Sequence, residues 1–327
     1  MALPQYKDSP VDLSTIVDFS ALSRKSVIIT GGASGLGKAY AVSFVQSGSF
    51  VTIADYDEVA GKKTAAELGG SAQFVKCDVR DWSQQVAVFE AAVRNSPDRS
   101  CDIVIANAGV VGVDSLLNFQ GPIHSGDDSP ARALATNPML LTEDADGSPV
   151  KPDLKIIEVN LLGSAYTSKL ALHYFRRQPF AETRDRCLIL KASIAAYADQ
   201  PGSPQYNASK WGSRGLMRSL RRVLWKEGIG VNLVAPWYVR TPILSDKTVE
   251  SLQSKGVKFA TVDDCAMAML RIATNKEING RSFAIVPRDE APSGAMDMAH
   301  DDYQDGDYLK DWQAVVLDTA QAVVEYA

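Results

Sequence analysis

The residues from Ser26 to Gly37 read SVIITGGASGLG, and this stretch decides the fold. The run SVIIT is apolar without alternation, which is typical of a strand buried on both faces of a parallel sheet. The glycine-rich turn that follows leads into a stretch with helical spacing of its apolar residues from Leu36 onward. Backbone N–H groups at the start of a helix bind anions, so the turn predicts an anion site between a strand and a helix.

The same alternation of short apolar runs and longer amphipathic stretches repeats along the chain. The further predicted strands are residues 50–55, 72–79, 101–109, 187–193, 230–236 and 281–287. The predicted helices are residues 36–47, 57–68, 82–95, 154–177, 204–227 and 262–274. Repeated strand–helix units of this kind predict an α/β fold, with a single doubly wound Rossmann-type parallel sheet of about seven strands and helices on both faces.

The length of 327 residues by itself suggests two domains. The alternation, however, occupies residues 25–287 as one predicted domain. Three segments lie outside it: a polar N-terminal leader at 1–24, a turn-rich insertion at 111–153, and a C-terminal extension at 288–327 whose last part, from Tyr308, is an amphipathic helix.

Composition excludes several classes of function. The net charge is −5 and no basic block is present, so nucleic acid is not an expected partner. The sequence has no apolar run long enough to cross a membrane and no N-terminal secretory signal. Its four cysteines include no CxxC pair, and its three histidines lack metal-ligand spacing, so no metal is expected. We therefore expect a cytoplasmic protein without membrane attachment.

The ends of the predicted strands carry the residues expected to bind a dinucleotide. A pyrophosphate would lie on the turn and on the start of the first helix, contacted by Gly31, Ser34, Gly35, Leu36 and Gly37. Asp55 ends the second strand, where a carboxylate accepts hydrogen bonds from both ribose hydroxyls and repels a 2′-phosphate. No cation adjoins Asp55, and we therefore expect NAD in preference to NADP.

Two later strand ends add to this predicted site. Asp78, followed by Val79, is placed to hold the adenine amino group. Asn107, Ala108 and Gly109 end the fourth strand, where small residues allow a cofactor to lie against the strand tips.

Five motifs together resemble the short-chain dehydrogenase/reductase family. They are TGGASGLG at 30–37, CDV at 77–79, NAG at 107–109, Ser193, and YNASK from Tyr206 to Lys210. The resemblance covers about residues 25–287. Within the family, the chain is similar to NAD-linked secondary-alcohol dehydrogenases of the 15-hydroxyprostaglandin type and of fungal secondary metabolism.

The spacing of Tyr206 and Lys210 suits proton transfer. Residues four apart share one face of a helix. A free tyrosine has a pKa of about 10, and the ammonium of Lys210 together with an oxidised nicotinamide would lower it. Tyr206 would then take the hydroxyl proton while hydride leaves the same carbon for the nicotinamide.

The resemblance implies further roles. Lys210 also binds the nicotinamide ribose, Ser193 holds the substrate oxygen, and Asn160 in IEVNLLG keeps a water for proton relay. Residues 236–242, PWYVRTP, resemble a segment that contacts the cofactor through Val239 and Thr241, although Trp237 stands where the family has glycine. The resemblance also implies a homodimer or homotetramer.

The residues expected to face the substrate are mainly apolar or aromatic: Ile194, Ala195, Tyr197, Gln205, Ile243 and Leu244. They predict a mostly hydrophobic small molecule with one secondary alcohol or ketone, its polar end oriented by Gln205 or Arg240. Two alternatives stay open. One is a non-redox lyase, isomerase or cyclase that uses Tyr206 as acid and base, and the other is a regulatory nicotinamide-binding protein without turnover.

Overall fold

The computed structural model describes residues 10–117, 148–179 and 185–325. Its centre is one eight-stranded sheet of order β3-β2-β1-β4-β5-β6-β7-β8. The strands are β1 (Ser26–Thr30), β2 (Phe50–Asp55), β3 (Ala72–Lys76), β4 (Ile103–Ala106), β5 (Cys187–Lys191), β6 (Gly230–Pro236), β7 (Ser282–Ile285) and β8 (Ala295–Asp297). The first seven pair in parallel, and the order reverses direction between β1 and β4. The predicted doubly wound α/β fold is confirmed.

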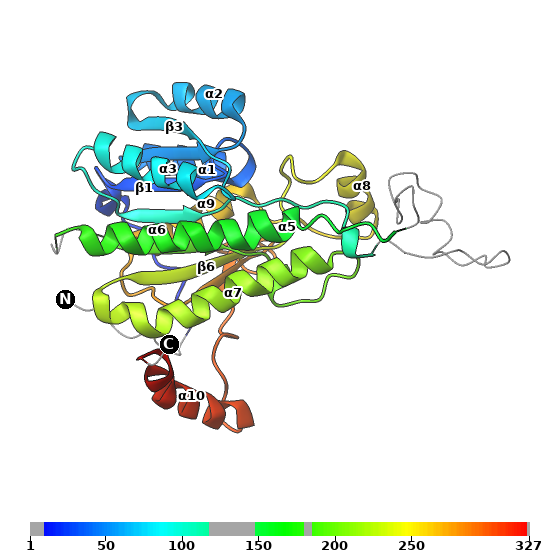
Figure 1. Cartoon of the computed structure of the whole chain (residues 1–327). Helices are drawn as coiled ribbons and strands as arrows, with labels where there is room; N and C mark the ends of the chain where they lie inside the picture. Colours follow the sequence, from blue (N-terminus) through cyan, green and yellow to red (C-terminus); the bar gives the residue numbers. More distant parts are fainter. Residues whose placement is uncertain (1–9, 118–147, 180–184, 326–327) are drawn as a thin grey trace.

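Helices cover both faces of the sheet (Figure 1). One face packs against α1 (Gly35–Gln46), α2 (Glu58–Leu68) and α9 (Val262–Thr274), with Phe44 and Met269 fully buried there. The other face packs against α3 (Trp82–Asn95), α6 (Gly163–Arg177) and α7 (Pro204–Leu224). The apolar strand residues alternate between the two buried layers, which is why their runs are continuous in the sequence.

Three elements differ from the expected pattern. The short strand β8 pairs antiparallel with β7 and adds an eighth strand from within the C-terminal extension. A helix, α8 (Asp246–Ser254), lies in the segment after β6. The single helix expected over 154–177 is instead α5 (Lys155–Ile157), the π-helical turn η4 (Glu158–Leu162) and α6.

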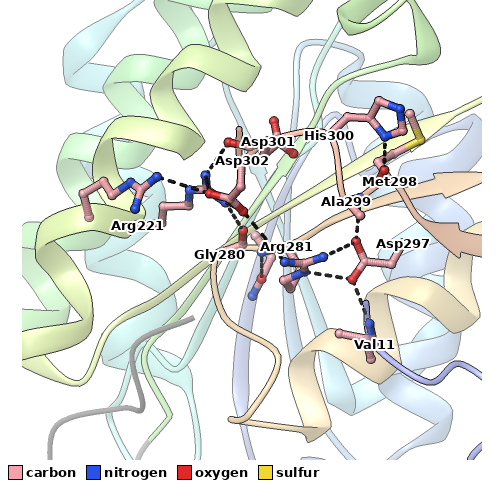
Figure 2. A network of polar contacts seen from close by, with 12 residues as sticks. Val11, Arg221, Gly280, Arg281, Asp297, Met298, Ala299, His300, Asp301 and Asp302 are labelled. Carbon is pink, nitrogen blue, oxygen red and sulfur yellow. Dashed lines mark hydrogen bonds and ion pairs between the residues drawn. The ribbon is translucent and has the colours of Figure 1, made fainter. Parts of the chain in front are cut away.

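The start of the C-terminal extension is fixed to the body by buried ion pairs (Figure 2). Arg281, next to β7, donates through Nε and Nη2 to the two carboxylate oxygens of Asp297, at 2.8 Å each. Asp297 also accepts from the backbone N–H of Val11 at 2.9 Å, which joins the leader to the extension. Arg221 of α7 donates to the carbonyl oxygens of Gly280 and Asp301, both at 2.7 Å. Residues 295–302 are therefore part of the folded domain.

The last helix, α10 (Tyr308–Glu325), stands away from the sheet and its covering helices (Figure 1). Trp312 is 64% exposed and Val315 is 61% exposed on it. The amphipathic helix expected from Tyr308 is thus present, and most of its described side chains are exposed to solvent. Most of the predicted insertion at 111–153 lies outside the described residues.

Candidate active site

A cavity of about 490 Å³ opens at the carboxyl ends of the parallel strands. This is the edge where open α/β sheets bind their ligands. Nearly all residues expected to bind the dinucleotide line it, namely Gly31, Ser34, Gly35, Leu36, Gly37, Asp55, Asp78, Val79, Asn107, Ala108, Gly109 and Thr241. Tyr206, Lys210 and Val239, which were also expected to bind the cofactor, are not among the lining residues. Val239 is 6% exposed and forms a bridge with Ala260.

The glycine turn has the shape that a pyrophosphate requires. A Cβ on Gly37 would lie 2.0 Å from the carbonyl oxygen of Gly31, and one on Gly31, at φ +66°, would lie 2.8 Å from the Cα of Ala108. Asn107 fixes the turn by donating through Nδ2 to the carbonyl of Gly31 at 3.0 Å. The Ser34 side chain does not cap α1, so the N–H groups of its first turn face the cavity without that partner. The residues present therefore fit a dinucleotide.

Asp55 is held at the cavity wall by backbone contacts. Its Oδ2 accepts from the N–H of Ala33 at 2.9 Å and its Oδ1 accepts from the N–H of Asp57 at 3.0 Å. Both contacts are to neutral groups, so the carboxylate keeps its charge uncompensated at the cavity wall.

Asp78 makes a contact that the sequence did not predict. Its carboxylate is bound by Arg80, through Nε at 3.0 Å and Nη2 at 2.7 Å, and Arg80 also reaches Glu158 at 3.4 Å. The hydrogen bond from Arg80 outweighs burial and lowers the pKa of Asp78. Arg80 therefore lines the cavity with its charge already paired, and the contact of Asp78 with adenine stays a prediction.

Tyr206, Lys210 and Ser193 meet at the other end of the sheet edge. Tyr206 and Lys210 lie one turn apart near the start of α7, with the Lys210 ammonium 5.4 Å from the centroid of the tyrosine ring. Lys210 is 2% exposed, and its Nζ donates to the carbonyl oxygen of Lys191 at 3.4 Å. Ser193 follows β5 and caps the short helix η5 (Ile194–Ala196), its Oγ accepting from the N–H of Ala195 at 3.2 Å.

The pKa values at this end are shifted in the direction that burial dictates. Burial raises the pKa of Tyr206, while a hydrogen bond with Ser193 opposes the shift. Burial, with the nearby charge of Lys191, holds the pKa of Lys210 well below its ordinary value. The low pKa expected for Tyr206 is therefore not a property of the protein alone, and it requires positive charge from a bound oxidised cofactor.

Asn160 lies in the π-helical turn η4 and is 1% exposed. Its Oδ1 accepts from the N–H of Val110 at 2.7 Å, and its Nδ2 donates to the Val110 carbonyl at 3.0 Å and to Ser209 Oγ at 3.2 Å. Its side chain thus ties the strand end after β4 to α7, next to Lys210. The expected role in holding a water stays a prediction.

Gln205 was expected to face the substrate, but its side chain is buried and bound by other residues of the chain. It is 1% exposed, and its Nε2 donates to Asp114 Oδ1 at 3.1 Å and to the carbonyl of Asp153 at 2.9 Å. Asp114 also accepts from the backbone N–H of Gln205 at 2.7 Å, close to the start of α7. Gln205 therefore connects Asp114 and Asp153, at the two described ends of the insertion, to the helix that carries Tyr206.

Trp237, the departure from the family pattern, is accommodated without backbone strain. Its φ is not positive. The ring packs against the α1/α9 layer, and its Nε1 donates to the carbonyl of Lys258 at 3.1 Å. A glycine is therefore not required at this position of the chain.

Comparisons with known proteins place the chain in a family. The model of the short chain dehydrogenase family matches residues 25–129 and 144–284. The 5′-hydroxyaverantin dehydrogenase of Dothistroma septosporum is 38% identical over 90% of this chain and 92% of that relative. An NADP-dependent dehydrogenase of Cochliobolus lunatus is 33% identical over 83% of this chain and 92% of its own length.

A solved structure agrees with the sequence relatives. The crystal structure of 3-hydroxyacyl-CoA dehydrogenase type-2 from Mycobacterium avium aligns with a TM-score of 0.62 and 29% identity, covering 80% of this chain and 93% of that one. The chain therefore belongs to the short-chain dehydrogenase/reductase family. It is a nicotinamide-dependent oxidoreductase that acts on a CH–OH group of a small molecule.

None of the helices within residues 10–117, 148–179 and 185–325 combines the length and apolarity that a membrane span requires.

Proposed function

We propose that the enzyme is an NAD-preferring dehydrogenase that interconverts a secondary alcohol and a ketone on a mostly hydrophobic molecule of fungal secondary metabolism. The observation that carries the proposal is the placement of Tyr206 beside Lys210 and Ser193, next to a glycine-lined dinucleotide cavity. The 5′-hydroxyaverantin dehydrogenase among the relatives supports a hydroxylated compound as substrate.

In this proposal each site residue has a defined role. Tyr206 takes the hydroxyl proton on alcohol oxidation and returns it on ketone reduction. Ser193 donates a hydrogen bond to the substrate oxygen, where negative charge develops. Lys210 supplies positive charge beside Tyr206 and holds the cofactor ribose, and Asn160 fixes the strand end against α7 and keeps a water for proton relay. The bound nicotinamide would accept or supply the hydride.

The test of the function is a panel of hydrophobic secondary alcohols incubated with the protein and NAD, with reduced nicotinamide measured by absorbance. We expect reduction of NAD with at least one alcohol and oxidation of NADH with the matching ketone. Turnover of substrate with no change in the redox state of the cofactor would instead identify a non-redox enzyme on this fold.

The preference for NAD rests on Asp55. A 2′-phosphate would meet its uncompensated carboxylate, and the nearby Arg80 is already bound by Asp78 and Glu158. We expect Asp55→Asn to narrow the affinity gap between NAD and NADP by about tenfold or more, because the repelling charge is gone. The amide oxygen can keep one of the two contacts to backbone N–H groups, while the amide nitrogen cannot accept the other.

The measurement is a titration of the purified protein with each dinucleotide. Asp57→Asn is the matched control, since Asp57 is an exposed neighbouring carboxylate that caps α2 by accepting from Ala60 N–H. Equal affinities of the parent protein for NAD and NADP would contradict the assignment. An equal narrowing of the affinity gap in Asp55→Asn and Asp57→Asn would also contradict it.

We further propose a homodimer or homotetramer located in the cytoplasm. The exposed apolar side chains of α10, such as Trp312 and Val315, support association of copies. The four cysteines are all free thiols, as in proteins of a reducing compartment. Light scattering of the intact chain is expected to give two or four times the mass of one chain, and a monomer at micromolar concentration would contradict the proposal.

A further inference from the structure

Lys191 is a cation on the cavity wall that the family motifs do not account for. It is the last residue of β5, two positions before Ser193, and it lines the cavity. A lysine there is unexpected because the other residues of β5, CLIL, are apolar and buried. Its side chain is partly buried, yet within the described residues its ammonium makes no hydrogen bond or ion pair.

Along the sheet edge, Lys191 lies at the end of the cavity that is next to Lys210 and far from Asp55. Strands β1 and β4 separate β5 from β2, which carries Asp55. Neighbouring strands lie about 4.8 Å apart, so the two side chains originate about 14 Å from each other. The backbone carbonyl of Lys191 accepts a hydrogen bond from Lys210 Nζ at 3.4 Å, so Lys191 is next to the proposed catalytic residues.

The charged groups around Lys191 leave its charge uncompensated. Lys210, from α7, is a second basic group, and the charge of Lys191 helps to lower its pKa. The thiol of Cys265, from α9, would raise the pKa of Lys191 if it carried a negative charge. Burial raises the pKa of this thiol to about 12, so it is neutral at physiological pH. Tyr40 of α1, behind Cys265, has its pKa raised well above the ordinary value by burial. The strands on either side of β5 contribute no acid there, with Asn107 after β4 and Val234 in β6.

An unpaired cation at this place distinguishes the two redox forms of the cofactor. The oxidised nicotinamide ring is positive and the reduced ring is neutral, and the rest of the dinucleotide is the same. We propose that Lys191 sets the relative affinity of the enzyme for the reduced over the oxidised cofactor, by penalising the positive ring and favouring the neutral one. This inference rests on the nicotinamide cofactor of the family and not on the identity of the substrate.

The pH dependence follows from the state of the ammonium. Burial lowers the pKa of Lys191 to about 8 in the free protein. A lysine with a lowered pKa is charged below that value and loses its charge as the pH rises through it. The preference for the reduced cofactor should therefore be large at pH 7 and small at pH 9.

The experiment compares dissociation constants of NAD and NADH, measured by calorimetry or protein fluorescence, for the parent, Lys191→Met and Lys191→Arg. Lys191→Met keeps the aliphatic length without charge, and it is expected to lower the ratio Kd(NAD)/Kd(NADH) at pH 7 by about tenfold. Lys191→Arg should keep a high ratio that no longer changes between pH 7 and pH 9. Lys155→Met, which removes an exposed cation from another part of the cavity wall, is the control and should change the ratio little.

The outcomes separate this inference from the proposed function. If both affinities fall by the same factor in Lys191→Met, or if neither changes, Lys191 does not discriminate redox state and the inference is wrong while the dehydrogenase assignment stands. If the parent binds neither form, both are wrong. The charge of Lys191 helps to lower the pKa of Lys210, so Lys191→Met also changes the titration of Lys210. The pH comparison therefore uses the parent and Lys191→Arg, which both place a positive charge beside Lys210 at pH 7.

Discussion

Replacing Tyr206 by phenylalanine is expected to lower kcat for alcohol oxidation by about a thousandfold or more while leaving NAD affinity within a factor of a few. Loss of a positioned general acid–base group typically costs a factor of about 100 to 10,000. The ring of Tyr206 stays next to Lys210 in the variant, so the change removes the hydroxyl and little else.

The measurement is kcat with a reactive secondary alcohol, together with a separate titration of NAD binding. Tyr238→Phe is the matched control, because Tyr238 lies close enough to act on the pKa of Tyr206 but packs with Trp237 and Phe259. Activity of the parent should also rise with pH, since the base acts as tyrosinate and burial raises its pKa. An unchanged kcat in Tyr206→Phe would show that another group transfers the proton.

The second large effect concerns stability. Asp301→Ala is expected to lower the free energy of unfolding by about 3–5 kcal/mol, because it leaves a buried guanidinium without its carboxylate. Asp301 accepts from Arg214 Nε at 2.7 Å and from the Tyr197 hydroxyl at 2.8 Å, and the Arg214 side chain is only 10% exposed. Glu58→Ala, at an exposed pair with Lys62, should cost far less, because solvent screens the attraction between exposed charges.

Denaturant unfolding at several pH values tests this prediction. Burial alone would raise the pKa of Asp301, but its hydrogen bonds and the charge of Arg214 lower it below the ordinary value. The stabilisation is therefore complete above about pH 4 and is lost as the pH falls through the lowered pKa. The difference between parent and Asp301→Ala should shrink in acid, and a loss no larger than that of Glu58→Ala would refute the importance of this pair.

Much of the fold could be predicted from the sequence because its signals are local. Strand and helix patterns between residues 25 and 287 depend on neighbours only a few positions apart, and the sheet confirms them. The pairing of Tyr206 with Lys210 is equally local, since it needs only one helical turn. Strand β8, by contrast, has three residues and no periodicity to recognise.

Contacts between distant parts of the chain could not be predicted. Gln205 was expected to face the substrate, but its partner Asp114 lies 91 positions away and is buried with it. Arg80 neighbours Asp78 in sequence, yet only the turn between them shows that the two charges pair. One signal was readable and was missed: a lysine at position 191 ends an otherwise apolar strand just before Ser193.

The contacts of Asp301 with Arg214 and Tyr197 also have a consequence for the synthesis of the enzyme. Asp301 joins α7, through Arg214, to the segment after Ser193, through Tyr197. The ribosome adds Asp301 after every proposed catalytic residue, about 90 positions later than Tyr206 and Lys210. A nascent chain can therefore hold all of these residues and still lack the Asp301 contact, which adds to the direct hydrogen bonds from Asn207 and Arg214 of α7 to residues 195–198. The buried ion pair between Asp301 and Arg214 forms only after Asp301 has been synthesised, so that fragments ending before it should be less stable than the whole domain.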